Sequence, residues 1–158
     1  MSKKYVELLK TVVVFIVTFL VAIVFLHFFR FSVVDGNSMN PTFKDKDQIM
    51  VLYTDTLQVN DVAILWSDEL DEYVIKRVIG CSGDHIQISD GKLYRNGARL
   101  YETYILEQNW TSDNCDLIVP DDCYFVLGDN RNNSIDSRVL GTFDKSDVYG
   151  RFIVKLPF

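Results

Sequence analysis

Two side chains in this sequence have the types needed for nucleophilic catalysis without histidine. Ser38 lies in the turn-like stretch GNSMNPTF, where small and polar residues surround the hydroxyl and Pro41 stiffens the chain. A serine hydroxyl becomes a nucleophile when an adjacent base takes its proton. The sequence contains only two histidines, His27 inside the most hydrophobic stretch and His85. The base for Ser38 is therefore expected to be another kind of residue.

The candidate base is Lys76, in the strand-like segment EYVIKRVIG at residues 72–80. Because side chains alternate between the two faces of a strand, Lys76 shares its face with the apolar Val74 and Val78. Burial disfavours the charged form of an amine, which lowers its pKa and makes it a usable base near neutral pH. The alternative is a lysine on an edge strand, whose stem lies on the sheet while its ammonium reaches water.

A third polar cluster, GDNRNNSIDSRVLG at residues 128–141, directly follows the hydrophobic run YFVL. The cluster begins where a strand ends, so its hydroxyls and amides are placed to orient a lysine amine. The alternative is a surface loop whose exposed ion pairs contribute little to stability. A Ser–Lys pair is a known substitute for Ser–His in acyl transfer, and these three segments together favour that chemistry.

The first 30 residues differ from the rest of the chain. Residues 11–29 contain no charged side chain, and a helix of about 1.5 Å per residue would cover roughly 28 Å, close to the thickness of a bilayer core. A cleaved signal peptide has a shorter apolar core and a site of small residues, whereas this run ends in HFFRF. A buried core helix would show a polar face. The sequence therefore predicts a retained transmembrane anchor.

Flanking charge predicts the orientation of this anchor. Lys3, Lys4 and Lys10 precede the apolar run, and only Arg30 immediately follows it. This asymmetry favours an amino terminus in the cytoplasm and a catalytic domain outside a cell membrane crossed once.

Charge and cysteine content exclude other classes. Residues 31–158 carry 12 Lys plus Arg against 21 Asp plus Glu, so binding of nucleic acid through phosphate neutralisation is not expected. Cys81, Cys115 and Cys123 include no C-x-x-C pair, which argues against a metal site, and no cofactor is expected. Spacing alone leaves open whether Cys115 and Cys123 form a disulfide.

Past the anchor the pattern is mostly β. An Asn96-Gly97 pair between two short arms is a strong hairpin signal. We predict an antiparallel β-sheet catalytic domain over 31–158 after a tail and transmembrane helix at 1–30, with a small hairpin or flap subdomain at about 91–120. The expected strands are apolar runs between polar turns, at 31–35, 48–53, 62–66, 72–80, 85–89, 123–129 and 148–156.

The three polar segments, in this order after an amino-terminal anchor, resemble the type I signal peptidases, membrane-bound Ser/Lys proteases. GNSMNPT is similar to that family's nucleophile box, KRVIGCSGD to its lysine box and GDNRNNSIDSRVLG to its final box. One departure is Ser82, where many relatives have proline; a local adjustment of the turn without loss of chemistry is expected. The short form is similar to that of Gram-positive relatives.

The resemblance implies a role for each matched residue. Ser38 would be the nucleophile, Lys76 the general base, and Ser134 a hydrogen-bonding partner that orients the lysine amine. The backbone N–H of Ser38 would donate to the oxyanion; because Gly36 lacks the hydroxyl that some relatives have there, a second donor is not assigned. The supporting residues would shape or brace the site or exclude solvent from it: Met39, Gly128, Asp129, Asp136 and Arg138, with Arg77 structural.

The implied substrates are signal peptides of exported preproteins, cut after small residues at A-x-A-like sites. The lipid bilayer and the secretion translocon are the other partners that the resemblance suggests. Two further functions compete: a self-cleaving Ser/Lys regulator, disfavoured by the anchor and the acidic domain, and an anchored assembly factor that has lost catalysis. The second would lack the serine or the lysine, and this chain has both.

Overall fold

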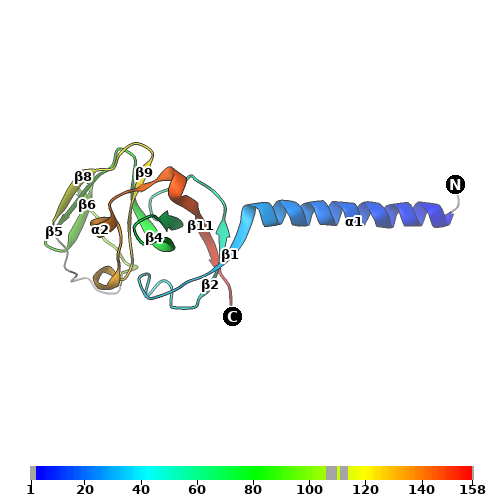
Figure 1. Ribbon diagram of the computed structural model, residues 1–158, viewed down its shortest axis with the longest axis horizontal. Helices are drawn as coiled ribbons and strands as arrows, with labels where there is room; N and C mark the ends of the chain where they lie inside the picture. The colour runs from blue at the N-terminus through cyan, green and yellow to red at the C-terminus, as the bar shows by residue number, and fades with distance from the viewer. Residues whose placement is uncertain (1–2, 106–109, 111–113, 158) are drawn as a thin grey trace.

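The computed structural model describes residues 3–105, 110 and 114–157. Two antiparallel β-sheets form one body, and a single long helix projects from it (Figure 1). The predicted mostly β fold with one amino-terminal apolar helix is confirmed. One short helix and two 3-10 turns, which the sequence pattern did not predict, lie in the described loops of this body: η1 (Arg131–Asn133), α2 (Ser137–Leu140) and η2 (Lys145–Asp147).

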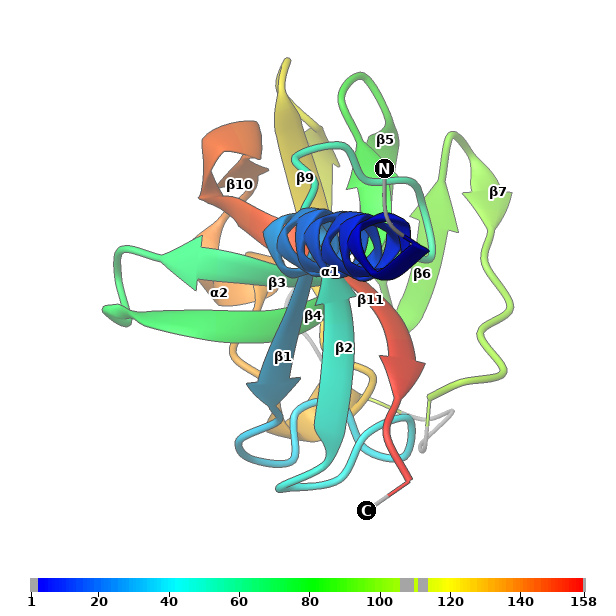
Figure 2. The same cartoon turned by 90° about the vertical axis from the view of Figure 1, so that its right-hand side faces the viewer.

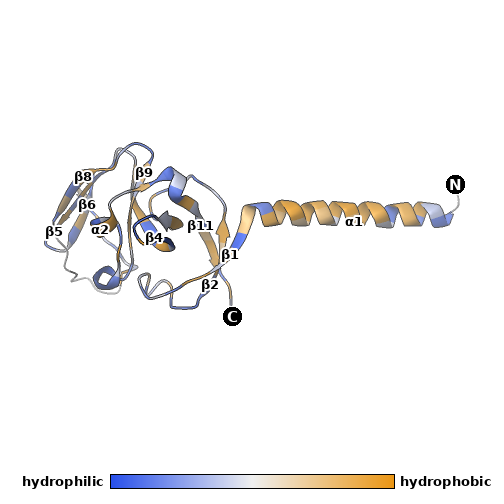
Figure 3. Cartoon of the chain, in the orientation of Figure 1, coloured by the Kyte–Doolittle hydropathy of each residue, from blue (hydrophilic) through white to orange (hydrophobic). Residues whose placement is uncertain are grey.

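Helix α1 (Lys3–Phe28) comprises 26 residues and none of them is buried. Figure 3 shows hydrophobic residues along most of this helix, and its length and composition are sufficient to cross a membrane. A core helix of a soluble domain would be buried against other elements, so that alternative is wrong. The strand that follows begins at Phe29, two residues earlier than the sequence suggested.

The main sheet contains seven strands in the order β1-β2-β11-β3-β4-β9-β10. Strands β1, β2 and β11 lie at the end of the body nearest α1 (Figures 1 and 2). Most of these strands are the β-branched and aromatic runs that the sequence indicated. Their bounds are β1 (Phe29–Val33), β2 (Gln48–Leu52), β3 (Val62–Ser67), β4 (Glu72–Cys81), β9 (Cys123–Leu127), β10 (Phe143–Asp144) and β11 (Val148–Lys155).

Strand β4 lies inside this sheet, between β3 and β9. Lys76 is opposite Ala63 on β3, and Arg77 is opposite Leu127 on β9. An edge-strand lysine with its ammonium in water is therefore the wrong interpretation of this segment. A position in the interior of the sheet fixes the backbone of Lys76 from both sides.

The second sheet has the order β7-β6-β5-β8 and lies at the end of the body far from α1 (Figure 1). Asn96 and Gly97, with φ of 54° and 77°, make the predicted hairpin turn. Cys115 and Asp116, within the predicted flap, begin β8, which was not among the expected strands. Residues 106–109 and 111–113 of the predicted flap lie outside the described residues. The strands are β5 (His85–Ser89), β6 (Lys92–Arg95), β7 (Ala98–Arg99) and β8 (Cys115–Ile118).

A shared apolar cluster joins the two sheets. Phe125 and Leu127 of the main sheet pack in one cluster with Ile86, Ile88 and Leu93 of the second. The segment after β7 adds two buried residues, Ile105 and Trp110, to this cluster. Packing of this kind makes the sheets one mechanical unit. The cysteines at 81, 115 and 123 are free thiols in the structure.

Candidate active site

The turn that carries Ser38 follows β1 and is held by its own backbone. Gly36 adopts a φ of 83°, a conformation that favours glycine, and its N–H donates to Asp45 Oδ1 at 2.8 Å. Met39 is 1% exposed and packs into the apolar cluster beneath the turn, and its carbonyl accepts from the Phe43 N–H. This buried neighbour fixes the turn from below and leaves Ser38 half-buried above it.

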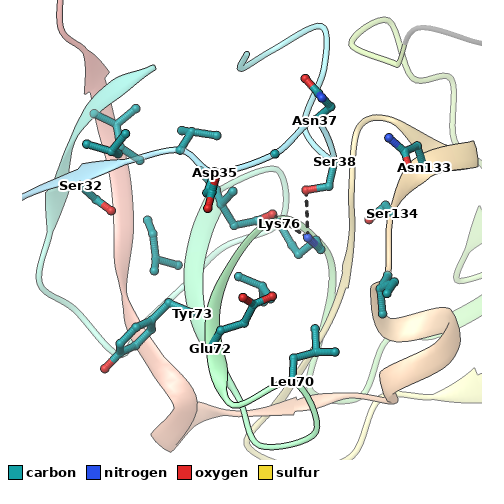
Figure 4. A pocket seen from close by; sticks show the side chains of 18 residues that line it. Ser32, Asp35, Asn37, Ser38, Leu70, Glu72, Tyr73, Lys76, Asn133 and Ser134 are labelled. Carbon is teal, nitrogen blue, oxygen red and sulfur yellow. Dashed lines mark hydrogen bonds between the residues drawn. The ribbon is translucent and has the colours of Figure 1, made fainter. Parts of the chain in front are cut away.

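The structure brings Lys76 to Ser38, as the sequence predicted. The lysine Nζ lies 3.1 Å from Ser38 Oγ and 3.1 Å from the Ile75 carbonyl oxygen, and Figure 4 shows the serine hydroxyl directed at the amine. Lys76 is 4% exposed. Burial lowers the pKa of this amine from 10.5 to about 8, and the Asp136 and Glu72 carboxylates oppose that shift only in part. A partly neutral amine at hydrogen-bond distance is what proton abstraction from a serine requires.

Asp129 is fully buried at the end of β9 and holds Arg77, the neighbour of Lys76. Arg77 donates from Nε and Nη2 to the two carboxylate oxygens, at 2.8 and 2.6 Å. The Thr42 hydroxyl also donates to this carboxylate. A bidentate arginine–carboxylate pair has a defined geometry, so the pair joins the turn after Ser38, strand β4 and the loop after β9.

Asp136 is fully buried and organises the rest of that loop. Its carboxylate caps helix α2 and accepts two bonds from the Arg138 guanidinium, both at 2.8 Å. The same carboxylate accepts the Gly128 N–H at 2.9 Å. These bonds bring both ends of the loop together beside Lys76, where the Asp136 charge also acts on the lysine.

The loop contacts the Ser38 backbone directly. The Asn130 N–H donates to the Ser38 carbonyl at 2.9 Å, and its side-chain amide donates to the Asn37 carbonyl at 3.1 Å. Gly128 packs so closely that a Cβ there would overlap the Ser134 hydroxyl and lie 2.6 Å from the Ser38 carbonyl oxygen. A glycine is therefore required at this point of contact.

Two polar groups at the site have no acceptor or donor among the described residues. The Ser134 hydroxyl is buried and makes no hydrogen bond there, although Ser134 and Lys76 line the same cleft. The backbone N–H of Ser38 likewise finds no acceptor in that part of the chain. Buried polar groups are normally paired, so the buried Ser134 hydroxyl is available to groups that enter or move within the site. The N–H of the half-buried Ser38 is available to such groups as well.

A cleft of about 570 Å³ leads to Ser38 and Lys76. One wall comes from the segment before the serine, including Ser32 and Asp35, and another from β4. Figure 4 shows Leu70, Glu72 and Tyr73 at the end of the cleft away from Ser38.

Sequence reasoning did not assign roles to several residues that shape this site. Asn130 and Thr42 lie within the polar motifs, and this position was the feature of the sequence that could have indicated their part in the site. Glu102, which binds Arg131 of the loop through two 2.6 Å bonds, gave no signal because 29 positions separate the two residues.

Comparison with known proteins identifies the family. The sequence matches the family model described as "Signal peptidase, peptidase S26" over residues 5–156. The chain belongs to the S26 signal peptidase family. Members of this family are serine peptidases, so this signal peptidase-family chain is assigned to that enzyme class.

Relatives along nearly the whole chain agree with this assignment. Signal peptidase I P of Bacillus subtilis subsp. natto is 36% identical over 151 residues, 87% of this chain and 82% of that protein. Signal peptidase I S of Bacillus subtilis strain 168 is 34% identical, over 94% of this chain and 87% of the relative. A crystal structure of a signal peptidase I from Enterococcus faecalis V583 superposes with a TM-score of 0.54 and 32% identity, covering 61% of this chain and 96% of that one.

Proposed function

We propose that this signal peptidase-family chain removes signal peptides from exported preproteins, with Ser38 as the nucleophile and Lys76 as the general base. The observation that carries the proposal is the 3.1 Å separation between Ser38 Oγ and the buried Lys76 amine. No histidine side chain is needed in this arrangement, since the lysine supplies a base whose pKa burial brings to about 8.

The reaction follows from this geometry. Neutral Lys76 accepts the Ser38 proton while Oγ attacks the scissile carbonyl carbon and the carbonyl oxygen gains the negative charge. The resulting ammonium donates that proton to the leaving amine as the C–N bond breaks, which gives a serine ester and the free mature amino terminus. Lys76 then accepts a proton from water, the hydroxide attacks the ester, and Ser38 leaves with the proton.

The groups around the pair have supporting roles in this proposal. In this proposal the unpartnered Ser38 N–H donates to the oxyanion, and the Ser134 hydroxyl hydrogen-bonds the lysine amine during the reaction. Asp129 and Asp136 brace the loop through Arg77 and Arg138. Met39 excludes solvent from below the turn.

The proposed substrate is an extended segment with small residues at the first and third positions before the cut. A peptide in the cleft would lie along β4 and the segment after β1 and pair with their backbones, while alternate side chains enter the walls. The apolar residues Ile64 and Ile75 line the same cleft as Ser38, and in this proposal they limit the size of the side chains that enter beside the hydroxyl.

The anchor helix indicates on which side of the membrane this reaction would take place. We propose that α1 crosses the cell membrane once, with the amino terminus in the cytoplasm and the β body outside, where signal peptides arrive still in the bilayer. The family match begins at residue 5 and includes most of this helix, which favours a retained anchor over a cleaved leader. The lipid bilayer and the secretion translocon would then be its partners.

Cleavage of a preprotein tests the function. The full chain, purified in detergent, is expected to cut a preprotein with an A-x-A site once, after the second alanine, as read from the mass of the mature product. A matched preprotein with leucine in place of that alanine should be cut at least about tenfold more slowly. No cutting of either by folded protein would favour the assembly factor, and equal cutting would contradict the pocket for small residues.

The pKa of Lys76 predicts how activity depends on pH. Because the base must be neutral and its pKa is lowered to about 8, kcat/KM should rise about tenfold per pH unit below that value and level off above it. Initial rates from pH 6 to 10 measure this. A rate that does not change between pH 6 and 9 would contradict the buried Lys76 amine as the base.

A further inference from the structure

One segment outside the catalytic motifs contacts all three arginines next to the site. The segment is the connector after β7, and it is described at residues 100–105 and 110. Its Tyr104 ring lies 4.0 Å from the Arg77 guanidinium, and the Trp110 ring lies 5.2 Å from that of Arg131 and 5.6 Å from that of Arg138. Cation–π contacts at such distances are attractive.

The strongest of these links is an ion pair between Glu102 and Arg131. Arg131 Nη1 and Nη2 each donate to a different Glu102 oxygen at 2.6 Å, and the two residues are 7% and 3% exposed. The Tyr104 hydroxyl adds a third bond to Glu102 Oε1 at 2.5 Å. A buried ion pair is often no more stabilising than apolar residues of the same size, but it fixes an orientation that apolar packing does not.

That orientation is passed to the backbone at Ser38. With its two terminal nitrogens held by Glu102, Arg131 directs Nε to the Gly128 carbonyl at 2.9 Å. Gly128 in turn packs against Ser134 and the Ser38 carbonyl, and the neighbouring Asn130 N–H bonds that same carbonyl. Glu102 is thus three contacts away from the nucleophile: through Arg131, through Gly128, to Ser38.

We propose that Glu102 is a positioning residue for the peptidase reaction: by fixing Arg131, it sets the Gly128–Asn130 backbone against which Ser38 is aligned to Lys76. The inference rests on the proposed function. It gives the second sheet and its connector a part in catalysis, because a shift of the loop by about 1 Å is enough to cost on the order of a hundredfold in rate. Glu102 is buried and does not line the cleft, so substrate binding should depend on it little.

The test is Glu102→Gln in the full chain, assayed in detergent with an A-x-A preprotein well below the unfolding temperature of each variant. The amide keeps the shape but turns one oxygen acceptor into an N–H₂ donor facing Arg131. We expect kcat to fall at least about tenfold with KM within threefold. Tyr104→Phe keeps the ring on Arg77 and removes one hydrogen bond to Glu102, and it should lower kcat about threefold. This variant tests the proposal if Glu102→Gln does not fold.

Ile105→Val and Ile105→Ala are the matched controls. Ile105 is buried in the same connector and packs in the apolar cluster between the sheets. These variants should lower the unfolding temperature as much as Glu102→Gln or more, while kcat of the folded protein stays within twofold. Unchanged kcat in the Glu102 and Tyr104 variants, or an equal fall in the Ile105 variants, would overturn the positioning role. Absence of cleavage by wild type would instead count against the proposed function itself.

Discussion

Replacing Ser38 with alanine is expected to lower kcat/KM for an A-x-A preprotein by at least about 10³-fold, with no change in fold. The substitution removes the hydroxyl oxygen that lies 3.1 Å from the Lys76 amine. Among the described residues no other hydroxyl is hydrogen-bonded to this amine, so only background hydrolysis through oriented water and the oxyanion donor is expected to remain. Initial rates of cleavage by the wild-type and variant proteins at equal concentration measure this loss of kcat/KM.

Ser89→Ala is the matched control for this experiment. Ser89 is an exposed residue at the end of β5 in the second sheet, so the same chemical change there should leave the rate within twofold. Circular dichroism and thermal unfolding of both variants should match wild type. Cutting by Ser38→Ala at the wild-type rate, after the same residue, would mean that Ser38 is not the nucleophile and that the proposed mechanism fails.

Local pattern was sufficient to predict most of the strands and, with the three polar motifs taken together, to propose Ser38 and Lys76 as a pair. Lys76 shares its face of β4 with Val74 and Val78, and these apolar neighbours are why its burial could be proposed from sequence beside the edge-strand alternative. The hairpin turn at Asn96-Gly97 could also be predicted from local sequence, because the turn needs two positive φ angles and these two residue types adopt them readily. The polar motifs were recognisable because each begins next to an apolar strand.

Pairings between distant residues could not be predicted. The sheet order places β11 between β2 and β3, a choice made by long-range packing and not by the residues of β11. Glu102 appears in sequence as one carboxylate among many, and only the folded chain shows that it faces Arg131 and leaves Asp129 to Arg77. The sequence contains the three carboxylates and the three arginines of these ion pairs, but no local pattern shows which carboxylate binds which arginine.

Replacing Lys76 with methionine should abolish activity and at the same time stabilise the protein at pH 7. A buried ammonium is costly, which is why the pKa of Lys76 falls from 10.5 to about 8. Below pH 8 both the folded and the unfolded chain hold the proton, and the folded state bears the full cost, on the order of 3 kcal/mol for such a shift. Methionine fills a similar volume without charge.

The sign of the effect changes with pH in a defined way. Between pH 8 and 10.5 the unfolded wild type still binds the proton that the folded one has released, so wild-type stability rises with pH across this window. We expect Lys76→Met to exceed wild type by about 1–3 kcal/mol at pH 7, after some loss from the unpaired Ile75 carbonyl, and by less at pH 9.5. Urea unfolding in detergent at both pH values measures this.

Lys92→Met provides the comparison, because Lys92 is an exposed strand lysine and its loss should change stability little at either pH. A Lys76→Met protein less stable than wild type at pH 7 would mean that the folded state favours the charged amine, which contradicts the lowered pKa. Burial would then give no reason for Lys76 to be neutral near physiological pH. We expect Lys76→Met to lose activity and to gain stability, with a gain that becomes smaller as the pH rises. Both effects have the same cause: burial of the Lys76 amine beside the Ser38 hydroxyl lowers the stability of the fold and makes the amine a usable base.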